Sequence, residues 1–174
     1  LCLLAQNETG YRNLMLLLSR SYQQGQYLGR PRVKQAWVKE YAEGVIALSG
    51  GRQGDIGQAL LNGREADARA ALTEWQRCFP DRFYLELQRT GRAGEEDYIH
   101  AAVALATECS CPVVATNDVR FLEADEFEAH EARVCIGYGR TLDDPRRLRA
   151  YSDQQYLRSA EEMAELFSDI PEAL

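Results

Sequence analysis

The chain has 174 residues, of which 45% are hydrophobic and 27% charged, and its formal net charge is −7. These values are typical of one soluble globular domain with a sizeable core, and the acidic balance argues against autonomous nucleic-acid binding, apart from a local basic patch. There is no apolar run long enough to span a bilayer and no signal peptide, so we expect a cytoplasmic protein without membrane contact.

The first 50 residues predict two strands and two helices. Residues 1–5 form an apolar run typical of a buried strand, and Asn7 is placed to cap a helix that ends near Gly25. A shorter helix over 33–41 then precedes a second buried strand over 45–49. The apolar residues of the first helix repeat at helical spacing: Tyr11, Leu14, Met15, Leu18 and Tyr22.

The rest of the chain continues the alternation of helices and strands. The predicted elements, in order, are a short helix capped by Asp55, a helix over 64–78, a strand over 83–88, a helix over 95–108, a strand over 113–115, a helix from 123 to about 136, and a helix that begins with a Ser159–Glu162 capping box.

Strands that alternate with helices predict parallel βα units. Four strands are too few to close a barrel, so the sequence predicts part of a barrel-like α/β domain. The chain opens on a strand without Met and stops where a helix is about to begin. We therefore expect a piece of a longer polypeptide, with an unpaired strand edge at residues 1–5 that favours self-association.

Two acidic residues stand out because of their place in the predicted strands. Glu86 lies in the middle of a buried-looking strand, where it either lines a polar cavity or pairs with a basic residue. Asp118 follows the next strand, at the end where parallel α/β folds place their chemistry. It is a candidate metal ligand or base, or else it caps the next segment or pairs with Arg120.

Other candidate motifs favour structural roles. The five cysteines include only one close pair, Cys109 and Cys111, so we expect reduced thiols rather than disulfides or a zinc site. His130 lies on an apolar helix seam, with Glu126 placed to bond it. The glycines of 49–57 match neither the Walker motif nor G-x-G-x-x-G and read as turns.

Several stretches, in a specific order and spacing, resemble one family. They are LLAQNETGYRNLMLLLSRSY, EGVIALSGGRQGDIGQALL, FPDRFYLELQRTG, PVVATNDVRF, EAHEARVCIGYG and LFSDIPEAL. They are similar to the PHP (polymerase and histidinol phosphatase) domain of the bacterial DNA polymerase III α subunit, in its proteobacterial form. The resemblance implies that residues 1–174 are part of one PHP domain, a distorted (β/α)7 barrel with parallel strands and flanking helices. The first strands, with the family's H-x-H motif, and all polymerase domains would lie outside it.

The chain departs from the metal-binding pattern of that family at two positions. In metal-binding members, the segment that matches residues 86–90 ends in a histidine ligand, and Thr90 stands at that position here. Those members also have an Asp-x-His ligand pair at the positions of Asp118 and Arg120, so Arg120 replaces the second histidine. A guanidinium stays protonated and offers no lone pair. The resemblance thus implies a degenerate metal site, without a metal or a catalytic residue, at Glu86, Thr90, Asp118 and Arg120. We expect Arg120 to fill the old cavity and bridge Asp118 and Glu86.

The function of this family implies a role for the chain. The parent chain would be a DNA-directed DNA polymerase, a nucleotidyltransferase that uses magnesium held by palm carboxylates outside this segment. The PHP domain itself would be a structural module that docks the proofreading exonuclease subunit, alongside other polymerase III holoenzyme subunits. DNA would be bound by the parent chain and not strongly by this domain. The alternative is a metal-dependent phosphoesterase or pyrophosphatase that uses Asp118 and Glu86. Thr90 and Arg120 favour the structural module over this hydrolase.

Overall fold

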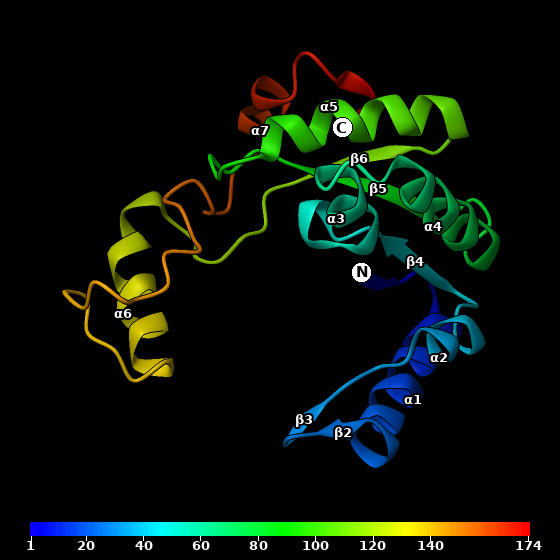
Figure 1. Cartoon of the computed structure of the whole chain (residues 1–174), viewed down its shortest axis with the longest axis horizontal. Coiled ribbons are helices and arrows are strands. Elements are labelled where there is room, and N and C mark those ends of the chain that lie inside the picture. Colours follow the sequence, from blue (N-terminus) through cyan, green and yellow to red (C-terminus); the bar gives the residue numbers. More distant parts are fainter.

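The computed structural model describes residues 1–174 as an α/β domain built on one open four-stranded sheet (Figure 1). The strand order is β1 (Cys2–Ala5), β4 (Val45–Leu48), β5 (Phe83–Gln88) and β6 (Val113–Thr116). The last three strands run parallel, as the βα pattern predicts. The sheet does not close into a barrel, and β1 forms one of its two edges.

The expectation of an all-parallel sheet is wrong for β1, which runs antiparallel to β4 with Cys2 opposite Leu48. The reason lies in the path between the two strands. The connecting segments bring the chain back to the end at which β1 finished, where Gln6 N donates to Gly44 O at 2.8 Å. β4 therefore starts beside the last residue of β1 and runs back along it.

The segments between and after these strands are mostly helical. They are α1 (Glu8–Gln24), the hairpin β2 (Gln26–Tyr27) and β3 (Arg30–Pro31), α2 (Gln35–Glu40), the 3-10 turn η1 (Gly51–Gln53), α3 (Asp55–Leu61), α4 (Glu65–Cys78), α5 (Glu95–Cys109), η2 (Ala124–Glu126), α6 (Phe127–Gly137), α7 (Ala160–Leu166) and η3 (Pro171–Ala173). None of the helices is both long and apolar enough to cross a membrane. All five cysteines are free thiols.

α1 begins where the sequence predicts, since Asn7 Oδ1 accepts a hydrogen bond from Gly10 N at 3.0 Å. Most of its apolar residues at helical spacing are exposed: Tyr11, Met15, Leu18 and Tyr22. The buried residues are Gly10, Leu17 and Ser21. A Cβ on Gly10 would clash with the carbonyl oxygen of Gly44, so a small residue at this point lets the helix approach the start of β4.

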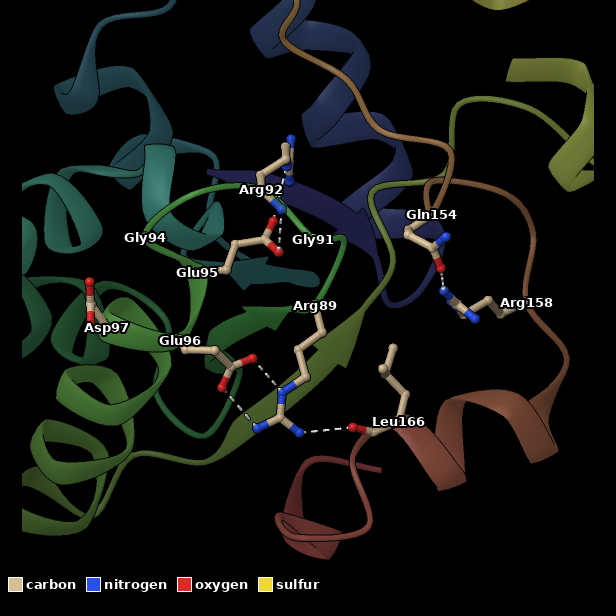
Figure 2. A pocket seen from close by; sticks show the side chains of 10 residues that line it. All are labelled: Arg89, Gly91, Arg92, Gly94, Glu95, Glu96, Asp97, Gln154, Arg158 and Leu166. Atoms are coloured by element: carbon tan, nitrogen blue, oxygen red, sulfur yellow. Dashed lines mark hydrogen bonds and ion pairs between the residues drawn. The ribbon is translucent and has the colours of Figure 1, made fainter. Parts of the chain in front are cut away.

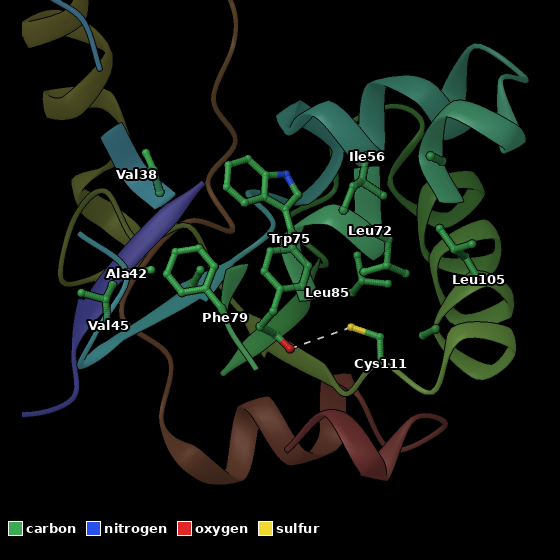
Figure 3. Packing of buried hydrophobic residues seen from close by; sticks show 14 of the residues in the cluster. Val38, Ala42, Val45, Ile56, Leu72, Trp75, Phe79, Leu85, Leu105 and Cys111 are labelled. Carbon is green, nitrogen blue, oxygen red and sulfur yellow. Dashed lines mark hydrogen bonds between the residues drawn. The ribbon is translucent and has the colours of Figure 1, made fainter. Parts of the chain in front are cut away.

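The main core lies between β5 and the helices α3 and α4 (Figure 3). Trp75 stacks on Phe83 with ring centroids 6.4 Å apart and also contacts Phe79. Asp55 is the first residue of α3, and Gly54 is its cap. The Oδ2 atom of Asp55 accepts a hydrogen bond from Trp75 Nε1 at 2.8 Å. The carboxylate thus satisfies the one polar group of the buried indole.

A second, smaller cluster joins β5 to the end of the chain, through Leu87, Tyr98 and Phe167. The helix that follows the predicted capping box is present. Ser159 Oγ accepts from Glu162 N at 3.2 Å, and Glu162 Oε2 accepts from Ser159 N at 2.7 Å. The carboxyl-terminal segment therefore packs back on the sheet.

Residues 119–158, which we call the α6 lobe, stand to one side of the sheet (Figure 1). The lobe packs around His130, whose ring contacts Phe121 and Tyr151 with centroids 5.5 and 4.7 Å away. The expected bond to His130 from Glu126 is absent, because Glu126 accepts instead from the backbone N–H groups of residues 122 and 123. The small core of the lobe is therefore aromatic.

Candidate functional site at the carboxyl ends of the strands

An open cavity of about 710 Å³ lies at the carboxyl ends of the parallel strands. Its walls include Glu86 from β5 and Asp118 and Arg120 from the segment after β6. The structure thus brings together three of the four positions at which the sequence predicts a degenerate metal site. The fourth, Thr90, is fully buried and does not line this cavity.

The carboxylate of Asp118 is surrounded by hydrogen-bond donors. Its Oδ2 lies 2.9 Å from Arg92 Nη1 and 2.8 Å from Gln155 Nε2, and its Oδ1 lies 2.6 Å from Arg120 Nη2. The Asp118 backbone has a φ of 44°, a left-handed conformation that aspartate tolerates better than most residues. Of the alternatives for Asp118, the pairing with Arg120 is confirmed.

Arg92 is the residue at this site that the sequence did not reveal. Its side chain is only 8% exposed, and it reaches three acceptors. Besides Asp118, Nε donates to Glu95 Oε1 at 2.9 Å and Nη2 donates to Gln88 Oε1 at 3.2 Å. Arg92 comes from the loop between β5 and α5, where no periodic pattern marks a functional residue. The only available signal is a basic residue three positions before Glu95, at a helix start.

Glu95 is the buried partner that holds this arginine in place. Figure 2 shows its carboxylate facing Arg92 from the first turn of α5. It also accepts hydrogen bonds from the backbone N and the hydroxyl of Thr90, both at 2.6 Å. Burial raises the pKa of Glu95, but the hydrogen bonds from Thr90 and Arg92 outweigh it and hold this pKa below its ordinary value. Thr90 is therefore a donor to a carboxylate, not a ligand position left vacant.

The other carboxylate, Glu86, is buried but forms no ion pair with lysine or arginine. Its oxygens accept from Thr116 Oγ1 at 2.6 Å, from Gln88 Nε2 at 3.1 Å and from Gly50 N at 3.1 Å. Neutral donors alone satisfy it. Of the two interpretations of this residue, the polar cavity is the one that the structure contains.

The expectation that Arg120 bridges Asp118 and Glu86 is wrong. The Arg120 side chain is 42% exposed, pairs with Asp118 alone, and packs over the ring of Tyr151 at 5.4 Å. The backbone explains this placement. After the left-handed residue at 118, Arg120 N donates to Gln155 O at 2.8 Å, so the segment leaves the direction of the strand. The buried cation is Arg92.

The residues present do not fit a metal ion of the kind that the resemblance implies for intact members. A divalent cation needs several ligands with free lone pairs. Here the oxygens of Asp118 and Glu95 are taken up by arginine, threonine and glutamine donors. No group of three or more His, Cys, Asp and Glu side chains is placed to hold a metal.

A second cavity, of about 450 Å³, is lined by the loop between β5 and α5, which carries Arg92 (Figure 2). Arg89 lines it and forms ion pairs with Glu96 and Asp169. The hydrogen bond from Arg89 lowers the pKa of Asp169 to about 2. This cluster ties β5 to the carboxyl-terminal segment, and Arg158 lines the same cavity without a carboxylate partner.

Comparison with known proteins identifies relatives of the whole chain. Residues 1–90 match the PHP domain family. The chain is 63% identical over 174 residues to the DNA polymerase III subunit alpha of Pseudomonas aeruginosa, 56% identical over 174 residues to that of Escherichia coli K12, and 53% identical over 174 residues to that of Vibrio cholerae. Each match covers 100% of this chain and 15% of the relative, so the chain spans about one seventh of those proteins.

Proposed function

The chain belongs to the PHP domain family, and we propose that it serves, within a DNA polymerase III α subunit, as a structural and docking domain without hydrolytic chemistry. The parent chain would be a DNA-directed DNA polymerase of the cytoplasm. Its magnesium would be held by carboxylates elsewhere in the α subunit. The identity of 63% over all 174 residues supports this assignment.

The observation that carries the structural role is the contact of Arg92 with both Asp118 and Glu95. Two carboxylates near one site repel each other unless a positive charge lies between them. In a metal-binding site the cation is the metal. Here it is a guanidinium, which stays protonated at any ordinary pH and cannot coordinate a metal or activate a water. The site is thus held in shape by a fixed internal charge.

The docking role concerns the proofreading exonuclease subunit and the other subunits of the polymerase III holoenzyme. It rests on the resemblance to polymerase α subunits. We propose no particular face for this partner.

One observation favours a second candidate, a metal-dependent phosphoesterase or pyrophosphatase. Glu86 is buried, faces the large cavity and lacks a positive partner. A metal bound there through ligands from another segment would supply that charge. Asp118 is then required as a second ligand, and its two arginine contacts oppose this role. We therefore rank the hydrolase second.

The test compares two activities of the purified α subunit that carries this domain. Hydrolysis of p-nitrophenyl phosphate and pyrophosphate is measured with added Mg²⁺, Mn²⁺ or Zn²⁺, and binding of the exonuclease subunit is measured by surface plasmon resonance. We expect binding and no hydrolysis above the level of a Glu86→Gln, Asp118→Asn variant. Hydrolysis that this double substitution abolishes would establish the hydrolase, and loss of binding alone would remove the docking role.

A further inference from the structure

The arginines of the α6 lobe are unevenly distributed. Residues 133–149 contain five arginines and only two carboxylates, Asp143 and Asp144, in a chain whose formal net charge is −7. This segment comprises the end of α6 and the loop that follows it. It is a basic stretch of an acidic domain, and we call it the α6 tip.

Two arginines of the α6 tip share a single carboxylate. Asp144 accepts from Arg140 Nη1 at 3.2 Å and from Arg146 Nε at 3.1 Å, and the side chains of these arginines are 38% and 74% exposed. The hydrogen bond from Arg146 holds the pKa of Asp144 below its ordinary value. Arg133 and Arg149 are exposed and bond no carboxylate at all. The fifth arginine, Arg147, pairs with Glu131, so the positive charges left without a carboxylate at this surface are those of Arg133 and Arg149.

The same segment carries an exposed aromatic side chain. Tyr138 is 65% exposed, and its hydroxyl has no protein partner. Its backbone is fixed, because Tyr138 N bonds to Val134 O at 3.1 Å and Arg140 N bonds to Cys135 O at 2.8 Å. The ring is thus presented to solvent from a rigid turn, between Arg133 and Arg140 in sequence.

We propose that the α6 tip binds single-stranded DNA, with arginines on the phosphates and Tyr138 stacked on a base. Proteins that track single strands combine a basic surface with aromatic side chains in this way. The proposal rests on the proposed function, since it supplies the DNA. It also gives this domain a DNA contact of its own, which the overall acidic charge does not suggest.

The position of the lobe makes this contact compatible with an acidic domain. α6 has 11 residues, which corresponds to a length of about 16 Å at 1.5 Å per residue. This exceeds the Debye length of about 8 Å at physiological ionic strength. The lobe also stands apart from the sheet (Figure 1). Carboxylates at the start of α6, such as Glu128, are therefore largely screened at the tip.

An acidic protein partner is the competing occupant, because Ile136 and Leu148 are also exposed on this segment. The exposed tyrosine with arginines on either side favours DNA, since a single strand offers both a phosphate and an aromatic face at each nucleotide. DNA binding and affinity for the exonuclease subunit, measured on the same variants, separate the two.

The test uses the α subunit that carries this domain, a fluorescent 20-nucleotide single strand, and anisotropy measured over a series of salt concentrations. The variants are Arg133→Gln with Arg149→Gln, and Tyr138→Ala. Arg12→Gln is the matched control, because Arg12 is an exposed arginine on α1. Each lost phosphate contact should reduce the slope of log K against log salt by about 0.7. Tyr138→Ala should weaken binding roughly fivefold or more.

The outcomes are distinguishable. If the wild-type subunit neither binds the strand nor extends a primer, the proposed function fails. If it does both, and the tip variants bind DNA like the Arg12→Gln control, the inference is wrong. Unchanged DNA binding with lost affinity for the exonuclease subunit would make the tip a protein interface and would likewise overturn it. Circular dichroism of each variant confirms that the fold is retained.

Discussion

Arg92 Nη1 lies 2.9 Å from Asp118 Oδ2, and this ion pair joins the loop after β5 to the segment after β6. The same guanidinium reaches Glu95 at 2.9 Å, so one buried cation serves two carboxylates from different elements. Such an arrangement needs all its members, because removing the cation leaves negative charge without compensation. We therefore expect Arg92, and not Arg120, to maintain this part of the fold.

Arg92→Ala should lower the free energy of unfolding by about 3–5 kcal/mol, the range for breaking a buried ion pair. Arg120→Ala should lower it by at most about 1 kcal/mol, because that side chain is 42% exposed and its pair is screened by water. Urea unfolding of the two variants and the wild type, followed by circular dichroism, makes the comparison. A larger effect of Arg120→Ala would reverse the assignment of the internal cation.

The stability of the domain should fall in acid through Glu95. The pKa of Glu95 in the folded state lies below its ordinary value of 4.5. Its ionised form therefore contributes stability that is complete above pH 4.5 and is lost as the pH falls through the folded-state pKa. Glu95→Gln should flatten the dependence of the unfolding free energy on pH in that range. Glu96→Gln, on the exposed side of the same turn, serves as control; equal pH profiles for Glu95→Gln and wild type would refute the role of this carboxylate.

Two neighbouring leucines of α1 test which face of this helix is buried. Leu17 is 5% exposed and Leu18 is 58% exposed. Leu17→Ala should cost about 2–5 kcal/mol, as for other buried leucines, whereas Leu18→Ala should change stability by no more than about 0.5 kcal/mol. Chemical unfolding of both variants decides this. If the two variants lose comparable free energy of unfolding, the exposed apolar face of α1 that contains Leu18 is covered in solution. Sedimentation would then show whether a second copy covers it.

The face of α1 shows where sequence reasoning reaches its limit. The apolar period of Tyr11, Met15 and Leu18 predicts a helix, and the helix is there. The period alone cannot say which side packs, because the close approach of Gly10 to Gly44 depends on a residue 34 positions away. Similarly, the direction of β1 depends on where the intervening segments return the chain, which no local pattern records.

The residues of the candidate site were likewise predictable only in part. Glu86 and Asp118 were predictable, because strand alternation and strand ends place them in one cavity. The role of Thr90 was not, since its partner Glu95 belongs to the next helix. Arg92 lies in an irregular loop, and its contacts to β5, α5 and the segment after β6 exist only once these elements have packed. The family resemblance located the site but not the cation inside it.

The cysteines provide a test of the packing around the sheet. Burial raises the pKa of Cys111 to about 11, and Cys135 is buried in the α6 lobe, whereas Cys2 is exposed. The thiolate is the reactive form, so Cys111 should resist modification at pH 8. With Ellman's reagent we expect Cys2 to react in the native protein, and Cys111 and Cys135 to react only on unfolding. Mass spectrometry of the labelled peptides assigns each site, and rapid labelling of Cys111 would contradict the packing of β5 on α5.

The metal content of the purified protein tests the central claim most directly. The 174-residue chain and the α subunit that carries it are dialysed against metal-free buffer, and zinc, manganese and iron are measured by plasma mass spectrometry. If Arg92 and Arg120 supply the positive charge at Asp118, both proteins should retain far less than one equivalent of any of these metals, and Thr90→His with Arg120→His should not change this while Arg92 remains. One tightly held equivalent in the wild-type protein would contradict the replacement of a metal by an arginine and would restore the hydrolase.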